Sequence, residues 1–100
     1  MKIVVQACKE SLAGVLRKIG YSFKRFNESA KEASAVRALA RGGFPRFHIY
    51  AKIEGNRLYL NLHLDQKRPS YAGVRAHSGE HESPAVREEA NRIKTLFRHG

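Results

Sequence analysis

The sequence has almost no cysteine and no long apolar run. Cys8 is the only cysteine among the 100 residues, and the opening apolar stretch covers only residues 1–5. A single cysteine excludes a disulfide within the chain and fits a reducing compartment. The opening stretch is far too short for a signal peptide or a membrane span. We therefore expect a cytoplasmic protein that does not cross a membrane.

Acidic residues are scarce as well, and several enzyme motifs are missing. Asp and Glu together number 9, against 19 Lys and Arg, so the formal net charge is +10 at pH 7. We find no glycine-rich loop that could cradle a phosphate, no nucleophile elbow and no paired carboxylates. A basic amphipathic helix with aromatic anchors is also missing, which argues against a membrane surface as the partner.

Positive charge is abundant, and it indicates a polyanionic partner. A net charge of +10 on so small a chain raises the local concentration of polyanions. Nucleic acid is the commonest such partner, because each phosphate neutralised by Lys or Arg releases counterions. We expect RNA more than DNA. Two alternatives stay open: a small interaction protein that meets an acidic partner protein, and a basic protein with no polyanionic ligand.

Two amphipathic helices are predicted, one near each end of the chain. Residues 11–19 place four apolar side chains at helical spacing, and Gly20 suits the left-handed position after the last turn. Ser83 can cap the second helix, with Pro84 at its first position. The two apolar stripes consist of Leu12, Val15, Leu16 and Ile19, and of Val86, Ala90, Ile93 and Phe97.

The region after the first helix is less uniform. Residues 21–26 carry aromatics with Lys and Arg beside them, a pattern typical of a short strand. Residues 27–43 are ambiguous, because their Ala, Lys and Glu content favours a helix that Gly42-Gly43 would end. Residues 35–40 could equally be a strand that leads into the next hairpin. We favour the strand.

The clearest feature is a hairpin. Residues 46–54 and 57–65 each alternate apolar and polar side chains, and Gly55-Asn56 between them suits a two-residue type II′ turn. Such a turn pairs residue 54 with residue 57. That register puts every apolar side chain on one face and every polar one on the other, which a slip of one residue would destroy.

The order of elements predicts a single basic α+β domain over residues 1–100. The hydrophobic content of 42% is enough for one modest core. We expect a small antiparallel three-stranded sheet with N- and C-terminal helices packed on its apolar face, in the order α-β-β-β-α. The polar face of the sheet is then left to solvent or to a ligand.

The polar face brings two histidines together. The hairpin register places His48 opposite His63 and Arg46 opposite Asp65, with β-carbons of facing residues only about 4.5–5.5 Å apart. Protonation of one imidazole disfavours protonation of the other, so one can be neutral while the other is charged. This combination suits general base and general acid catalysis of RNA cleavage, with Arg46 steadying the phosphate. A metal-independent endoribonuclease with catalytic His48 and His63 is therefore an alternative to simple binding.

The remaining candidates are nucleic-acid contacts. Tyr50 and Tyr59 are diagonal neighbours that could stack on unpaired bases, and the loop after the hairpin is basic. An ordinary solvated face is an equally open interpretation of such polar residues. The predicted contacts are Arg46, Tyr50, Lys52, Arg57, Tyr59 and Asn61 on the hairpin, and Lys67, Arg68, Tyr71 and Arg75 in the loop.

No cofactor is expected, and the signal for a metal is weak. His63, Asp65, His77 and His81 offer nitrogen and oxygen ligands, and His48 could join them. Their spacing matches no zinc motif, and the chain has no Cys pair.

The layout resembles the small HicA-type mRNA-interferase toxins, whose fold is similar to a double-stranded-RNA-binding domain. Leu12, Leu16 and the Gly20-Tyr21 step resemble the first helix of that family and the entry into its strand, and His48 resembles its strand histidine. The Gly-Ser-His-His run of the family is replaced by Pro-Arg-Phe-His at residues 45–48, and residues 27–43 look like an insertion. The resemblance implies an endoribonuclease in which His48 is catalytic, and an antitoxin is an example of the acidic partner considered above.

Overall fold

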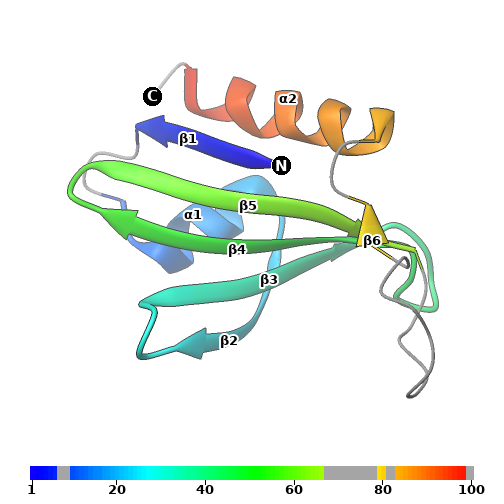
Figure 1. Ribbon diagram of the computed structural model, residues 1–100, viewed down its shortest axis with the longest axis horizontal. Coiled ribbons are helices and arrows are strands. Elements are labelled where there is room, and N and C mark those ends of the chain that lie inside the picture. Colours follow the sequence, from blue (N-terminus) through cyan, green and yellow to red (C-terminus); the bar gives the residue numbers. More distant parts are fainter. Residues whose placement is uncertain (7–9, 67–78, 81–82, 99–100) are drawn as a thin grey trace.

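The computed structural model describes residues 1–6, 10–66, 79–80 and 83–98. In chain order the elements are β1 (Lys2–Gln6), α1 (Leu12–Ile19), β2 (Ser22–Asn27), β3 (Glu32–Ala38), β4 (Arg46–Glu54), β5 (Arg57–Asp65), β6 (Gly79–Glu80) and α2 (Pro84–Arg98) (Figure 1).

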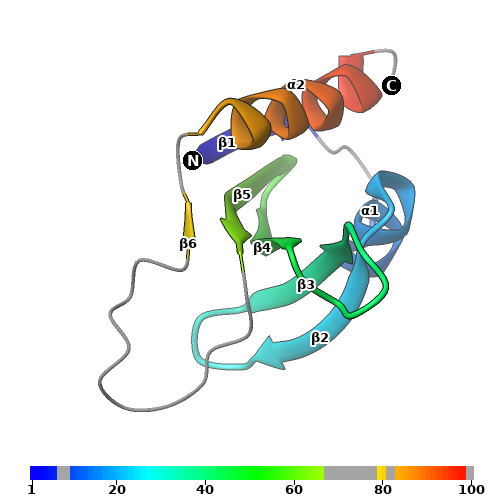
Figure 2. The same cartoon turned by 90° about the vertical axis from the view of Figure 1, so that its right-hand side faces the viewer.

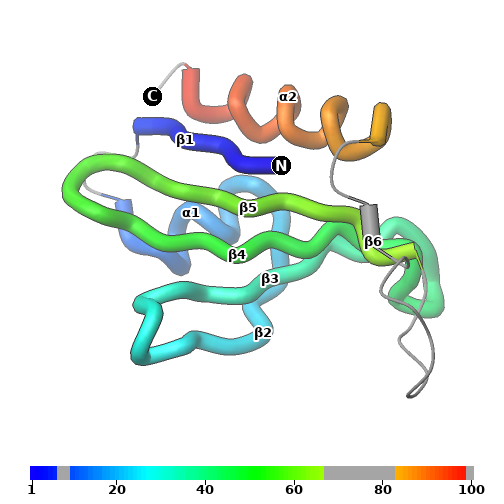
Figure 3. Tube along the Cα trace, in the orientation of Figure 1, coloured from blue at the N-terminus to red at the C-terminus, as the bar shows by residue number. Residues whose placement is uncertain are grey.

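The strands form one antiparallel sheet in the order β1-β5-β4-β3-β2, and the two-residue β6 pairs with the end of β5. The β4–β5 hairpin therefore runs through the middle of the sheet, between β1 and β3 (Figure 3). The predicted three-stranded α-β-β-β-α sheet is wrong, because β1 as well as both β2 and β3 join the β4–β5 hairpin in one sheet.

The first strand is missing from the sequence prediction for a physical reason. β1 pairs with β5, with Lys2 opposite Asn61 and Gln6 opposite Arg57. No turn or neighbouring segment specifies this pairing. Ile3 is 1% exposed, and its place in the core supplies the stabilisation that local sequence does not.

The ambiguous residues 27–43 contain a strand rather than a helix. The Asn27 side chain accepts a hydrogen bond from the Ala30 N–H (3.1 Å), and Lys31 adopts a left-handed φ of 55°. This turn folds β3 back onto β2, as Asn side chains commonly do. The strand favoured for residues 35–40 is confirmed as a strand, but its bounds differ: β3 begins at Glu32 and ends at Ala38.

The local signals at the helix ends and the hairpin turn are confirmed. Ser11 Oγ accepts a hydrogen bond from the Gly14 N–H (3.0 Å), and Gly20 closes α1 with a φ of 85°. Ser83 Oγ accepts from the Val86 N–H (3.3 Å) at the start of α2. Gly55 has a φ of 64°, as the first residue of a type II′ turn requires. Within the described part of the chain, neither helix is long and apolar enough to span a membrane.

Both helices pack against the same side of the sheet. In Figure 2 the sheet curves around the space that α1 and α2 fill. The buried stripes of the two helices and the alternate strand residues join one core, and the other side of β4 and β5 carries polar side chains. The strand residues of this core are Ile3, Ala33, Ala35, Phe47, Ile49, Ala51, Leu58, Leu60, Leu62 and Leu64.

One buried carboxylate ties α2 to the rest of the fold. Glu89 is only 4% exposed and accepts hydrogen bonds from the Tyr21 hydroxyl (2.7 Å), Arg37 (3.2 Å) and Arg92 (2.8 Å). Arg92 also donates to the carbonyl of Ile19 at the end of α1 (2.6 Å). Burial, followed by the hydrogen bond to Glu89, raises the pKa of Tyr21. The cluster is fully paired, so its role is structural.

Substitution of Glu89 tests this role. Glu89→Gln leaves Arg37 and Arg92 without their counter-charge, and breaking a buried pair costs roughly 3–5 kcal/mol. Both arginine side chains are 36% exposed, so water offsets part of this loss and we expect about 2–3 kcal/mol. Urea unfolding followed by circular dichroism measures the difference. Glu88→Gln, an exposed neighbour on the same helix, should stay within about 0.5 kcal/mol; equal effects of the two variants would contradict the structural role.

Candidate functional site

Two imidazoles and a phenol ring stack together on the polar face of the hairpin. His48 of β4 lies opposite His63 of β5, as the turn register predicted. Their ring centroids are 4.9 Å apart. Tyr50 stacks on both, with its centroid 4.7 Å from that of His48 and 5.8 Å from that of His63. The planes of the two imidazoles are tilted by 45° to each other.

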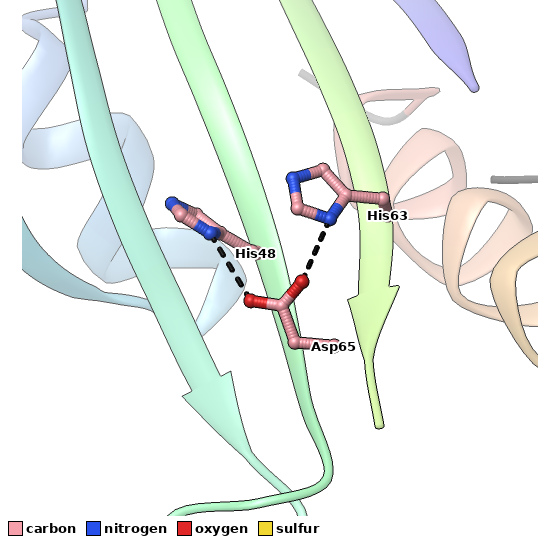
Figure 4. Close-up of side chains that lie close together, drawn as sticks. All are labelled: His48, His63 and Asp65. Atoms are coloured by element: carbon pink, nitrogen blue, oxygen red, sulfur yellow. Dashed lines mark hydrogen bonds and ion pairs between the residues drawn. The ribbon is translucent and has the colours of Figure 1, made fainter. Parts of the chain in front are cut away.

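The carboxylate of Asp65 lies between the two imidazoles (Figure 4). Its Oδ1 is 3.0 Å from Nδ1 of His63, and its Oδ2 is 3.4 Å from Nδ1 of His48. Arg46 Nε also donates to Oδ2, at 3.4 Å. The predicted Arg46–Asp65 pair is confirmed, but one carboxylate that contacts both histidines was not foreseen.

Ser34 completes the cluster, although no sequence pattern indicated that it would. Its Oγ is 2.6 Å from Nε2 of His48, and the residue is 8% exposed. In β3, Ser34 pairs with Tyr50 and therefore shares the polar face. Ser34, His48 and Asp65 thus form a continuous chain of hydrogen bonds through the imidazole. The same connectivity relates a nucleophile, a base and an orienting carboxylate in hydrolases.

The environment favours the neutral form of His48. Burial lowers the pKa of His48 below its usual value, and the neighbouring charge of His63 lowers it further. The carboxylate of Asp65 opposes this shift but does not cancel it. At neutral pH the His48 ring is therefore mainly uncharged, and its one unprotonated nitrogen has a lone pair that can accept a proton or bind a metal ion.

Two cavities adjoin the cluster and meet at Tyr50. The larger has a volume of about 420 Å³ and no acidic residue in its wall. The smaller, about 280 Å³, has two tyrosines in its wall. The first is lined by Lys24, Arg25, Ser34, Val36, Arg46, His48 and Tyr50. The second is lined by Lys2, Ile3, Val4, Glu32, Tyr50, Lys52, Tyr59, Leu60 and Asn61.

A β-bulge explains why Lys24 and Arg25 reach the same cavity. Consecutive residues of a regular strand point to opposite faces. The pairing of β2 with β3 shifts between Phe23 and Arg25, and such an irregularity redirects side chains. Lys and Arg beside the aromatics were visible in the sequence, but the bulge that turns both to one side was not.

The structure brings most of the predicted contacts on the hairpin together. Arg46, Tyr50, Lys52, Tyr59 and Asn61 line the two cavities. Arg57 instead pairs with Glu54 at the turn and lines neither cavity. The other predicted residues lie outside the described part of the chain: Lys67, Arg68, Tyr71 and Arg75 of the loop, and the metal candidates His77 and His81.

Three side chains of the cluster could hold a metal ion. His48, His63 and Asp65 each offer one ligand atom, and these atoms lie within 4.8 Å of one another. His63 and Asp65 were among the weak metal candidates in the sequence, and His48 was expected to be able to join them; their grouping follows from the strand register.

Comparison with protein-family models, with curated proteins and with solved structures found no significant match to this chain. The likeness to HicA-type toxins therefore stays a prediction, and the function has to be argued from the site.

The pKa of His48 should respond to its two neighbours in opposite directions. His63→Gln removes a charge that lowers this pKa, so the pKa should rise; Asp65→Asn removes a charge that raises it, so the pKa should fall further. Imidazole NMR titration of chelator-treated protein measures both shifts. Tyr59→Phe, on the same face, should leave the His48 titration unchanged. Shifts of the same sign in the two histidine-cluster variants would contradict the geometry described.

Proposed function

We propose that this protein binds single-stranded RNA along the polar face of its sheet. The observation that carries the proposal is the pair of cavities that meet at Tyr50, one walled by cations and the other by tyrosines. A nucleotide has the same two halves, an anionic phosphate and a flat base. The net charge of +10 supplies the long-range attraction that such a ligand needs.

The larger cavity suits a phosphate. Lys24, Arg25 and Arg46 stand in its wall, and guanidinium groups match phosphate oxygens in charge and shape. The hydroxyl of Ser34 and the ring of His48 add polar groups on the same wall. No acidic residue in this wall repels an anion. The nearest carboxylate, Asp65, already accepts from Arg46.

The smaller cavity suits an unpaired base. Tyr50 and Tyr59 offer aromatic surface, and the Asn61 amide and Lys52 can hydrogen-bond to a base edge. Bases in a duplex are stacked on each other and do not reach such a cavity, whereas RNA loops and ends present free bases. The cavity therefore favours a single strand. We propose RNA rather than DNA because RNA commonly presents unpaired bases in its loops and ends.

Salt dependence and Arg25 test the phosphate cavity. In fluorescence anisotropy with a short labelled single-stranded RNA, affinity should fall steeply as salt rises. Arg25→Gln should weaken binding at every sequence and reduce the slope of log affinity against log salt by about 0.7, the value for one phosphate contact on a single strand. Arg87→Gln removes the same charge at an exposed position of α2 and should leave the slope of log affinity against log salt nearly unchanged. Affinity that does not change with salt, or an equal loss of affinity in both variants, would contradict the proposal.

A competition experiment separates RNA from an acidic partner protein. Polyglutamate that competes as well as RNA would point to the acidic protein instead.

Tyr59 tests the base cavity separately. Tyr59→Leu should raise the Kd for single-stranded RNA by about tenfold, because base–aromatic stacking contributes about 1–3 kcal/mol per base. The salt slope should stay the same, since no charge is lost. Tyr59→Phe keeps the ring and should bind like the unaltered protein. If duplex RNA binds as tightly as single strands and Tyr59→Leu has no effect, the base cavity is not used.

A further inference from the structure

The polar cluster has the composition and spacing of a metal centre. We infer that His48, His63 and Asp65 bind one divalent transition-metal ion. Metal–ligand bonds to nitrogen and oxygen are about 2.0–2.2 Å long, so neighbouring ligand atoms on one ion lie roughly 3.0–3.5 Å apart. The separation is 3.0 Å between Nδ1 of His63 and Oδ1 of Asp65 and 3.4 Å between Nδ1 of His48 and Oδ2, so each carboxylate oxygen lies at such a distance from one imidazole.

The ligand atoms of the cluster lie close enough to share an ion after a rotation of the side chains. All three ligand atoms lie within 4.8 Å of one another. Two ligands of one ion are at most about 4.2 Å apart, twice the bond length. In tetrahedral geometry the ligand atoms lie roughly 3.4 Å apart, so the widest-spaced pair must approach by about 1.4 Å, which rotation of the rings about their side-chain torsions supplies. Figure 4 shows both rings already turned toward the carboxylate between them.

The donor set selects the class of metal. Two imidazole nitrogens and one carboxylate oxygen suit zinc, iron(II), cobalt, nickel or manganese. Magnesium and calcium fit less well, because they prefer sites made of oxygen ligands alone. Three protein ligands leave further coordination positions for water or substrate. The side chains of His48, His63 and Asp65 are 14%, 15% and 19% exposed, so an ion there stays within reach of solvent.

Neighbouring residues supply the support that metal ligands usually have. A histidine that binds a metal through one nitrogen commonly donates its other N–H to a nearby oxygen. Ser34 Oγ lies 2.6 Å from Nε2 of His48 and can accept that hydrogen bond when Nδ1 holds the ion. Arg46 contacts the Asp65 oxygen that faces His48, and Tyr50 stacks on both rings. Ser34 is thus a positioning residue of the proposed centre.

The competing explanation needs no metal. Asp65 could simply accept a hydrogen bond from each Nδ1–H, which would leave the two imidazoles as an acid–base pair. Ser34 separates the two explanations, because its oxygen must accept from His48 in the metal-bound form. Loss of the hydroxyl should therefore weaken metal binding.

The position of the ion also connects it to RNA, and this part rests on the proposed function. His48 lines the cation-walled cavity as well as the cluster. A phosphate oxygen held in that cavity is the ligand best suited to an open coordination position. The ion should therefore strengthen RNA binding.

Metal titration of the full chain tests the centre without RNA. Chelator-stripped protein should bind one Zn²⁺ in calorimetry and develop visible d–d absorption with Co²⁺. Either His63→Ala or Asp65→Asn should weaken binding at least 100-fold. Ser34→Ala should weaken it about 10- to 100-fold, the usual effect of losing a partner of a metal-bound histidine, and Ser34→Thr, which keeps the hydroxyl, should restore it. Arg57→Gln, on the same strand but outside the cluster and both cavities, is the matched control.

Two further measurements keep the test decisive. Thermal unfolding in the presence of chelator shows whether each variant is folded. In the unaltered protein, Co²⁺ should broaden the imidazole NMR signals of His48 and His63 before those of the other histidines. Binding that survives in both His63→Ala and Asp65→Asn, or no saturable binding at all, would overturn the inference. RNA binding that persists unchanged in chelator would disprove only the phosphate link, and the proposed RNA site would stand.

Discussion

The pairing register of β4 and β5 is the constraint on which the site depends. Gly55 adopts a left-handed φ of 64°, and the tight turn it allows fixes His48 opposite His63. Because side chains alternate along a strand, a slip of one residue would bury the imidazoles and expose the leucines. The same register therefore builds the core under the helices and the polar cluster on the other face.

The two helices and the β4–β5 hairpin could be predicted from short stretches of sequence, because neighbouring residues determine where they begin and end. Ser11, Gly20 and Ser83 mark helix ends through hydrogen bonds and backbone angles of nearby residues, and the Gly55-Asn56 turn defines its own hairpin. β1 could not be predicted in this way, because the strand it pairs with, β5, lies more than fifty residues further along the chain. The sheet is therefore larger than the sequence suggested.

The candidate site shows the same difference between what neighbouring residues determine and what long-range strand pairing determines. Alternation within one hairpin predicted the His48–His63 and Arg46–Asp65 pairs. Ser34 joins them only through the register of β3 with β4, and β3 could not be told from a helix by pattern. Lys24 and Arg25 share a cavity because of a bulge, which no periodicity reveals. Long-range pairing, rather than residue type, supplies the missing half of the site.

The fold holds two ionic clusters with different characters. Glu89 is buried on the inner side of α2 and accepts hydrogen bonds from Tyr21, Arg37 and Arg92, as a structural carboxylate should. His48, which contacts Asp65, instead lines a cavity with cationic walls, which we interpret as an RNA-binding surface. Amide chemical-shift mapping with a short single-stranded RNA tests this most directly. The largest changes should fall on the polar-face residues of β2 to β5 around Tyr50; changes centred on α2, or none at low salt, would contradict it.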